Sequence, residues 1–177
     1  AETYQFGETK FDGVISRFGV MFFSDPTKAF TNIHSAMKEH AFLTFICWPS
    51  RQENKYFHDM TEAVLKHTGK KYRDSGTEPG PTAFSDNDYV KSILNSSGFS
   101  NVSIETVQTR LSAKMTPEFD AGLHMEYGPS SLLIREAQPD EVMKQKIYEE
   151  LLSVCTRHQE GEYVSHDAAI NIVSASA

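Results

Sequence analysis

This sequence has little cysteine, and its basic residues are fewer than its acidic ones. Its two cysteines, Cys47 and Cys155, lack the spacing of a metal site among 177 residues, so we expect reduced thiols in a core. The 24 acidic residues outnumber the 17 basic ones and give a net charge of −7. Phosphate binding relies on clustered lysine and arginine, so this balance excludes nucleic acid as a main partner.

Long apolar runs are missing as well. The most apolar stretches, residues 14–23 and 41–49, are too short or too interrupted for the roughly 20 residues that a membrane-spanning helix needs. The first ten residues are polar and do not resemble a signal peptide. We therefore expect a cytoplasmic protein without a membrane span. The absence of an initiator methionine is typical of a trimmed chain, a proteolytic product or one piece of a longer protein.

Several catalytic motifs are also absent. No two of the seven histidines have the H-x-x-x-H or H-E-x-x-H spacing, so we expect no metal site. The G-x-S-x-G turn of serine hydrolases and the G-x-x-x-x-G-K loop of nucleotide-binding proteins do not occur either. Hydrolase and phosphoryl-transfer chemistry of these kinds is therefore not expected.

What is present is an alternation of strand-like and helix-like segments. Residues 41–48 (AFLTFICW) are almost wholly apolar, which is typical of a parallel strand covered on both faces. A strand, a helix and this second strand predict a right-handed βαβ unit. The predicted strands are residues 11–18, 41–48, 101–111 and 168–175, and the predicted helices are residues 26–40, 53–68, 86–97, 117–126 and 139–158. We expect one α/β domain over residues 1–177.

Two motifs carry a resemblance to a known family. FDGVISRFGVMFF (residues 11–23), followed by a helix at Asp25-Pro26 and by FLTFICW, resembles the fourth strand, fourth helix and fifth strand of class I S-adenosylmethionine-dependent methyltransferases. GPTAFSDNDYVKSILNSSGFSNVSIE (residues 80–105) is similar to the stretch before the sixth strand of the ubiquinone/menaquinone-type (UbiE-like) small-molecule branch. The chain thus resembles the C-terminal half of a Rossmann-like fold.

This resemblance implies an architecture. Strands four to seven of the family lie in the order 4-5-7-6, so we expect a mostly parallel sheet with one antiparallel strand and helices on both faces. The segment Gly13–Phe18 would then be an exposed sheet edge, because the neighbouring first strand is missing. An apolar edge invites pairing with another chain, and we expect a homodimer joined there.

The resemblance also assigns site residues. Ligands in open α/β sheets bind beyond the carboxyl ends of the strands. The residues expected to contact S-adenosylmethionine are Ala1, Glu2, Ser16, Arg17, Phe18 and Met21. Trp48 is expected to line the pocket of a small-molecule substrate. The alternatives are a surface salt bridge for Arg17, core packing for Phe18 and Met21, and a packed rim position for Trp48.

His124, within GLHMEYGP, is the candidate general base, because the substrate-covering helices of the family come from this region. The alternative is a surface or packing role.

The glycine-rich loop that grips the cofactor in this family is absent. None of the ten glycines lies in a G-x-G-x-G loop at a strand–helix junction. We therefore expect methyl transfer to a small-molecule acceptor in an intact parent protein, with weak or absent cofactor binding by this chain alone. The alternative function is a non-catalytic binding or assembly domain derived from a methyltransferase.

Overall fold

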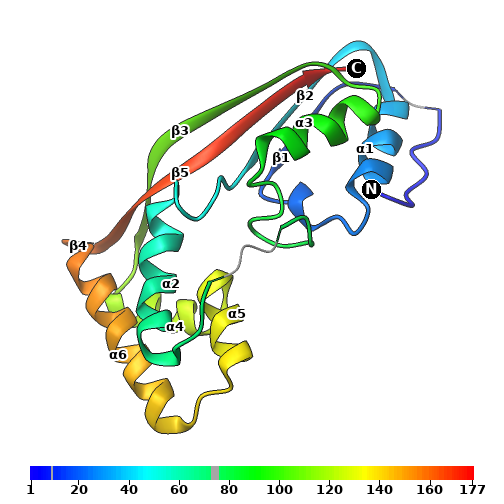
Figure 1. Cartoon of the computed structure of the whole chain (residues 1–177). Coiled ribbons are helices and arrows are strands. Elements are labelled where there is room, and N and C mark those ends of the chain that lie inside the picture. The colour runs from blue at the N-terminus through cyan, green and yellow to red at the C-terminus, as the bar shows by residue number, and fades with distance from the viewer. Residues whose placement is uncertain (9, 73–75) are drawn as a thin grey trace. The chain divides into compact units, whose positions relative to one another are not determined.

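The computed structural model describes residues 1–8, 10–72 and 76–177. Contacts divide the chain into two compact units, called here unit 1 (residues 1–50, 75–107 and 170–177) and unit 2 (residues 51–74 and 108–169). A single domain over residues 1–177 stays a prediction. In chain order, the elements in Figure 1 are β1 (Phe11–Arg17), the 3-10 helix η1 (Val20–Phe22), α1 (Pro26–Ser35), β2 (Met37–Cys47), α2 (Lys55–Thr68), α3 (Asn87–Ser96), β3 (Ser100–Lys114), α4 (Pro117–Glu126), α5 (Gly128–Ala137), α6 (Glu141–Arg157), β4 (Gln159–Glu160) and β5 (Tyr163–Ser176).

The strands form one mixed sheet in the order β1-β2-β5-β3, with the short β4 paired to β5. This order is the expected 4-5-7-6. The expectation of a mostly parallel sheet is wrong, because the parallel β1–β2 pairing is followed by an antiparallel β2–β5 pairing. Side-chain hydrogen bonds join residues 100 to 176, 106 to 171 and 112 to 165, so β3 and β5 are also antiparallel. The reversed strand lies inside the sheet and therefore makes each of its pairings antiparallel.

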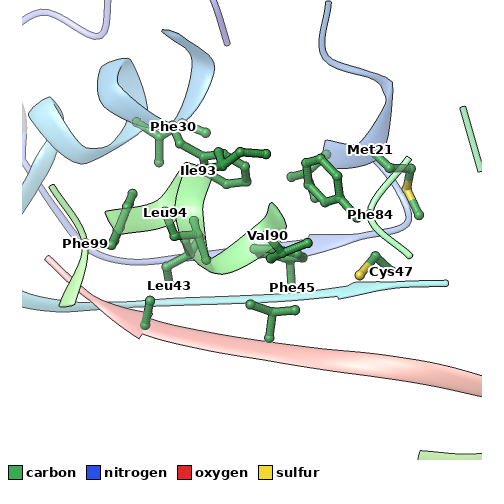
Figure 2. Packing of buried hydrophobic residues seen from close by; sticks show 14 of the residues in the cluster. Met21, Phe30, Leu43, Phe45, Cys47, Phe84, Val90, Ile93, Leu94 and Phe99 are labelled. Atoms are coloured by element: carbon green, nitrogen blue, oxygen red, sulfur yellow. The ribbon is translucent and has the colours of Figure 1, made fainter. Parts of the chain in front are cut away.

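The core of unit 1 lies on one face of this sheet. Figure 2 shows side chains of α3 gathered with Leu43 and Phe45 of β2, and Phe30 of α1 belongs to the same cluster. Burial alternates along β2, so that Leu43 is fully buried whereas Phe42 is 53% exposed. The sequence predicted a sheet covered by helices on both faces, but in unit 1 the face carrying Phe42 is left partly open.

The first helix begins as predicted and ends early. Asp25 caps it by accepting a hydrogen bond from the Lys28 backbone N–H (2.9 Å), and Pro26 follows. The helix was expected to reach His40, because Ala36 and Met37 continue its apolar spacing. Both residues are buried, but β2 has already begun at Met37. The apolar pattern therefore predicted correctly that Ala36 and Met37 are buried, but it did not predict where the helix ends.

Unit 2 contains four helices among the residues that the structure describes. The core is formed by apolar residues of α2, α4, α5 and α6, among them Val64, Ile147 and Leu151. The helix α4 has the predicted bounds, whereas α5 was not predicted from the sequence. Cys155 lies in this core, and Cys47 lies in the core of unit 1. Both thiols are free.

Among the described helices, none combines the length and the apolar character needed to cross a bilayer.

Candidate functional site

The carboxyl ends of β1 and β2 bring two aromatic residues together in unit 1. The Phe18 ring stacks on the Trp48 indole, with 4.1 Å between the ring centroids and 14° between the planes. The Phe18 N–H donates a hydrogen bond to the Ile46 carbonyl (3.1 Å). The backbone of Phe18 has φ of 53°, a left-handed conformation that costs a non-glycine residue about 1–2 kcal/mol. We call Ser16, Arg17, Phe18 and Trp48 the strand-end cluster.

The polar members of the strand-end cluster differ in exposure. Ser16 is half-buried, whereas Arg17 is exposed and has no ion-pair partner among the residues that the structure describes. The surface salt bridge considered for Arg17 is therefore not formed here. Its guanidinium is accessible to an anionic ligand such as a carboxylate.

Three other residues that were expected to contact a cofactor lie elsewhere in unit 1. Met21 is 1% exposed and belongs to the hydrophobic core. The Glu2 carboxylate accepts a hydrogen bond from the Ser24 backbone N–H (2.7 Å), and the Ala1 carbonyl accepts one from the Asn32 side chain (2.5 Å). Ala1 and Glu2 therefore fasten the N-terminal segment beside α1, and Met21 serves the core.

A second group of polar side chains lies inside unit 2. Asp120 and His124 are one turn apart on α4, and His166 comes from β5. All three are about 95% buried. A hydrogen bond of 2.7 Å joins His166 Nε2 to Asp120 Oδ2, and 3.7 Å separates His124 Nε2 from Asp120 Oδ1. We call these three residues the Asp–His cluster.

Further polar and aromatic groups surround the Asp–His cluster. The Tyr56 ring centroid lies 5.2 Å from the ring centroids of both His124 and His166. Burial and the nearby Asp120 charge raise the pKa of the Cys155 thiol. The same two causes raise the pKa of Tyr56. Both groups are therefore protonated at neutral pH.

Burial and nearby charge also set the protonation states of Asp120 and His124 on α4. Burial opposes ionisation of Asp120, yet the hydrogen bond from His166 and the other nearby donors leave the pKa of Asp120 below its usual range. Burial lowers the pKa of His124 to about 4, although the Asp120 charge opposes this shift. At neutral pH the interior therefore holds a carboxylate beside a neutral imidazole.

His124 has an unusual chemical position. Its Nε2 is buried and has no hydrogen-bond partner. A base with a pKa near 4 accepts a proton weakly at neutral pH, which disfavours the general-base role considered for His124. In the tautomer that carries its proton on Nδ1, this nitrogen has a lone pair that can bind an electron acceptor. The ring is reached from an apolar hollow lined by Tyr56, Leu123, Tyr127 and Pro129.

Two members of the Asp–His cluster were missed in the sequence. No two histidines have the spacing of metal ligands, and the available signal was instead the Asp120-x-x-x-His124 spacing on a predicted helix. His166 lay just before the predicted strand at residues 168–175. Because β5 begins at Tyr163, His166 is a buried strand residue.

Comparisons with known proteins give similarities in structure alone. No family model matches the sequence, and no curated protein matches it either. The chain is similar to a protein of Bacillus halodurans C-125 that is named as a candidate methyltransferase, with 14% identity and a TM-score of 0.48, over 99% of this chain and 68% of that one. The YcgJ protein of Bacillus subtilis gives 11% identity and a TM-score of 0.46, over 99% and 67%.

A third similar structure is phosphoethanolamine N-methyltransferase 2 of Haemonchus contortus in complex with S-adenosyl-L-methionine. It gives 15% identity and a TM-score of 0.42 over 98% of this chain, which spans 34% of that protein.

Proposed function

We propose that this chain is the strand-four-to-seven portion of an S-adenosylmethionine-dependent methyltransferase that acts on a small molecule. The observation that carries the proposal is the strand order β1-β2-β5-β3 with a reversed β5. The resemblance carried by residues 11–23 implies the same order. The order depends on contacts between segments far apart in the sequence, so it is independent of the local features that make up the motif.

The open face of unit 1 supports the view that the chain is a portion of a larger fold. The run AFLTFICW is apolar at consecutive positions, as in a strand covered on both faces. Here one face is buried and the other is partly open, with Phe42 53% exposed. On the edge strand, Ile15 is 78% exposed. A further layer and a further strand, as the first half of a methyltransferase would supply, would bury this apolar surface.

The strand-end cluster would form one side of the cofactor pocket. S-adenosylmethionine supplies a methyl group on a positively charged sulfur, and transfer depends mainly on proximity and orientation. Arg17 would pair with a carboxylate of the bound molecules, and the stacked faces of Phe18 and Trp48 would exclude water and favour a nearby cation. The cluster could contact one side of such a ligand, but it lacks the close backbone contacts that a glycine-rich loop makes with the cofactor. We therefore expect weak binding by this chain alone.

Trp48 is the single tryptophan of the chain and makes the proposal testable by fluorescence. The chain and the full-length protein encoded by its gene would each be titrated with S-adenosylhomocysteine, with calorimetry as a second readout. We expect micromolar binding by the full-length protein and at least about 100-fold weaker binding by this chain. Arg17→Ala in the full-length protein should weaken binding about tenfold, as loss of one charge-assisted contact does.

Two results would contradict the proposal. A full-length protein that binds neither S-adenosylmethionine nor S-adenosylhomocysteine would rule out the methyltransferase assignment. Equal loss of binding in Arg17→Ala and in the control Lys91→Ala, an exposed position on α3, would rule out the assigned side of the pocket. Micromolar binding by this chain alone would overturn the separate expectation that the chain binds the cofactor weakly because it lacks a glycine-rich loop.

The second candidate function is a non-catalytic assembly domain. The observation that favours it is the exposure of Ile15 on the edge strand β1, where another chain would add a strand. It predicts self-association without cofactor binding in the full-length protein, so the same titration separates the two functions.

A further inference from the structure

We propose that Asp120, His124 and His166 bind a divalent transition-metal ion, with zinc as the best fit, inside unit 2. The inference goes beyond methyl transfer and does not rest on it. Two imidazoles and a carboxylate are a donor set used by zinc sites that have three protein ligands and a fourth position for water. One ligand-capable atom from each residue lies within 4.8 Å of the other two.

The spacing within the Asp–His cluster suits such an ion. In a tetrahedral site with zinc bonds of about 2.0–2.1 Å, neighbouring ligand atoms are about 3.3 Å apart. Asp120 Oδ2 lies 2.7 Å from His166 Nε2, and the other carboxylate oxygen, Oδ1, lies 3.7 Å from His124 Nε2, so a small rotation of the carboxylate would let one oxygen serve a tetrahedral ion together with both imidazoles. The ion would take the place of the proton in the Asp120–His166 hydrogen bond, and His166 would then carry its proton on Nδ1.

The unpartnered Nε2 of His124 is a second, independent observation. Buried polar atoms are nearly always paired, so this buried nitrogen without a partner requires an explanation. The nearby Asp120 carboxylate does not fill this role, because its oxygen lies 3.7 Å away. A bond to a metal ion would give the nitrogen a partner. The positive charge of the ion would also offset the negative charge of the buried Asp120 carboxylate.

The surroundings of the Asp–His cluster resemble a support for metal ligands. The Cys155 thiol lies near Asp120, and outer partners of this kind orient a ligating carboxylate. The His158 ring lies 4.6 Å from the His166 ring and restricts its rotation. The hollow that reaches His124 gives an ion a path from the surface of unit 2.

The test uses the purified chain after removal of metals with a chelator. Titration with Co²⁺ should give the visible absorption of a tetrahedral site with one ion per chain. Zinc should displace the cobalt and bleach the absorption. Zinc at about 100 times its dissociation constant should raise the melting temperature by roughly 5–10 °C.

Variants locate the site. The substitutions Asp120→Asn, His124→Gln and His166→Gln should each weaken zinc binding by more than the 10–100-fold that loss of an outer partner typically causes. The control His58→Ala, a half-buried histidine of α2 in the same unit, should leave affinity unchanged. If a ligand variant fails to fold, the cobalt titration of the unmodified chain still decides.

Two outcomes overturn the proposal. An unmodified chain without tetrahedral cobalt absorption would show that the Asp–His cluster is a hydrogen-bonded group that holds no metal. Retention of binding in a folded His124→Gln variant, with loss in His58→Ala, would place the ion at the surface.

Discussion

Phe30 shows how one residue can organise a core. It is completely buried, and its ring meets those of Phe23, Phe45, Phe84 and Phe99. Loss of a buried phenylalanine typically costs 3–5 kcal/mol, because both transfer energy and packing are lost. We expect Phe30→Ala to lower the free energy of unfolding by about 3–5 kcal/mol in urea denaturation followed by circular dichroism.

The matched control for that substitution is Phe119→Ala. Phe119 lies on α4 and is 61% exposed, so its loss should change the free energy of unfolding by less than about 0.5 kcal/mol. A Phe30→Ala variant no less stable than this control would show that Phe30 is not part of a tightly packed core.

Single residues were predicted well where the signal is local. Asp25 before Pro26 identifies a helix cap from neighbouring residues alone, and Asp25 does cap α1. The positive φ of Phe18 and the meeting of Asp120 with His166 could not be predicted in this way. Both depend on partners brought near by the fold.

At the scale of elements, an ion pair joins α2 to α6. The Lys66 ammonium lies 2.7 Å from the Glu150 carboxylate, and this hydrogen bond holds the pKa of Glu150 below its ordinary value. A carboxyl with a lowered folded pKa contributes stability above the unfolded pKa of about 4.3 and loses it as pH falls through the folded value. Lys66 is exposed and Glu150 is partly buried, so the contribution should be about 1 kcal/mol or less.

We therefore expect Glu150→Gln to lower the free energy of unfolding slightly at pH 7 and to have a smaller effect at acidic pH, where Glu150 is protonated in both states. Urea denaturation at both pH values measures the difference. Glu136→Gln, at an exposed position of α5, should show no such pH dependence. An effect of Glu150→Gln that grows towards low pH would contradict the assigned sign.

Element type was easier to predict than element limits. The buried apolar pattern placed α1 and β2 correctly, but it could not say where the helix stops, since Ala36 and Met37 are buried in either conformation. The helix α5 was missed although Pro129 stands in its first turn, a typical start signal. The strand β5 is longer than its apolar segment because it begins with the polar residues around His166.

At the scale of the whole molecule, β1 is an edge of the sheet and Ile15 on it is 78% exposed. An apolar edge with unpaired backbone groups favours strand addition by a second copy. We expect size-exclusion chromatography with light scattering at high micromolar concentration to give twice the 19.9 kDa chain mass. Ile15→Lys should give a monomer.

Val142→Lys is the matched control for this experiment, because Val142 is also an apolar residue, 66% exposed, and belongs to α6 and not to β1. It should leave the dimer intact. A clean monomer of the unmodified chain at that concentration would refute the dimer.

The position of β5 has a consequence for how the protein is made. Of the five strands it leaves the ribosome last, yet in the finished sheet it stands between β2 and β3. Until it emerges, both of those strands present unpaired backbone edges, a state that favours wrong pairing with other chains. The nascent chain therefore depends on shielding by a chaperone or on rapid completion of synthesis, and slow translation near β5 should lower the yield of folded protein.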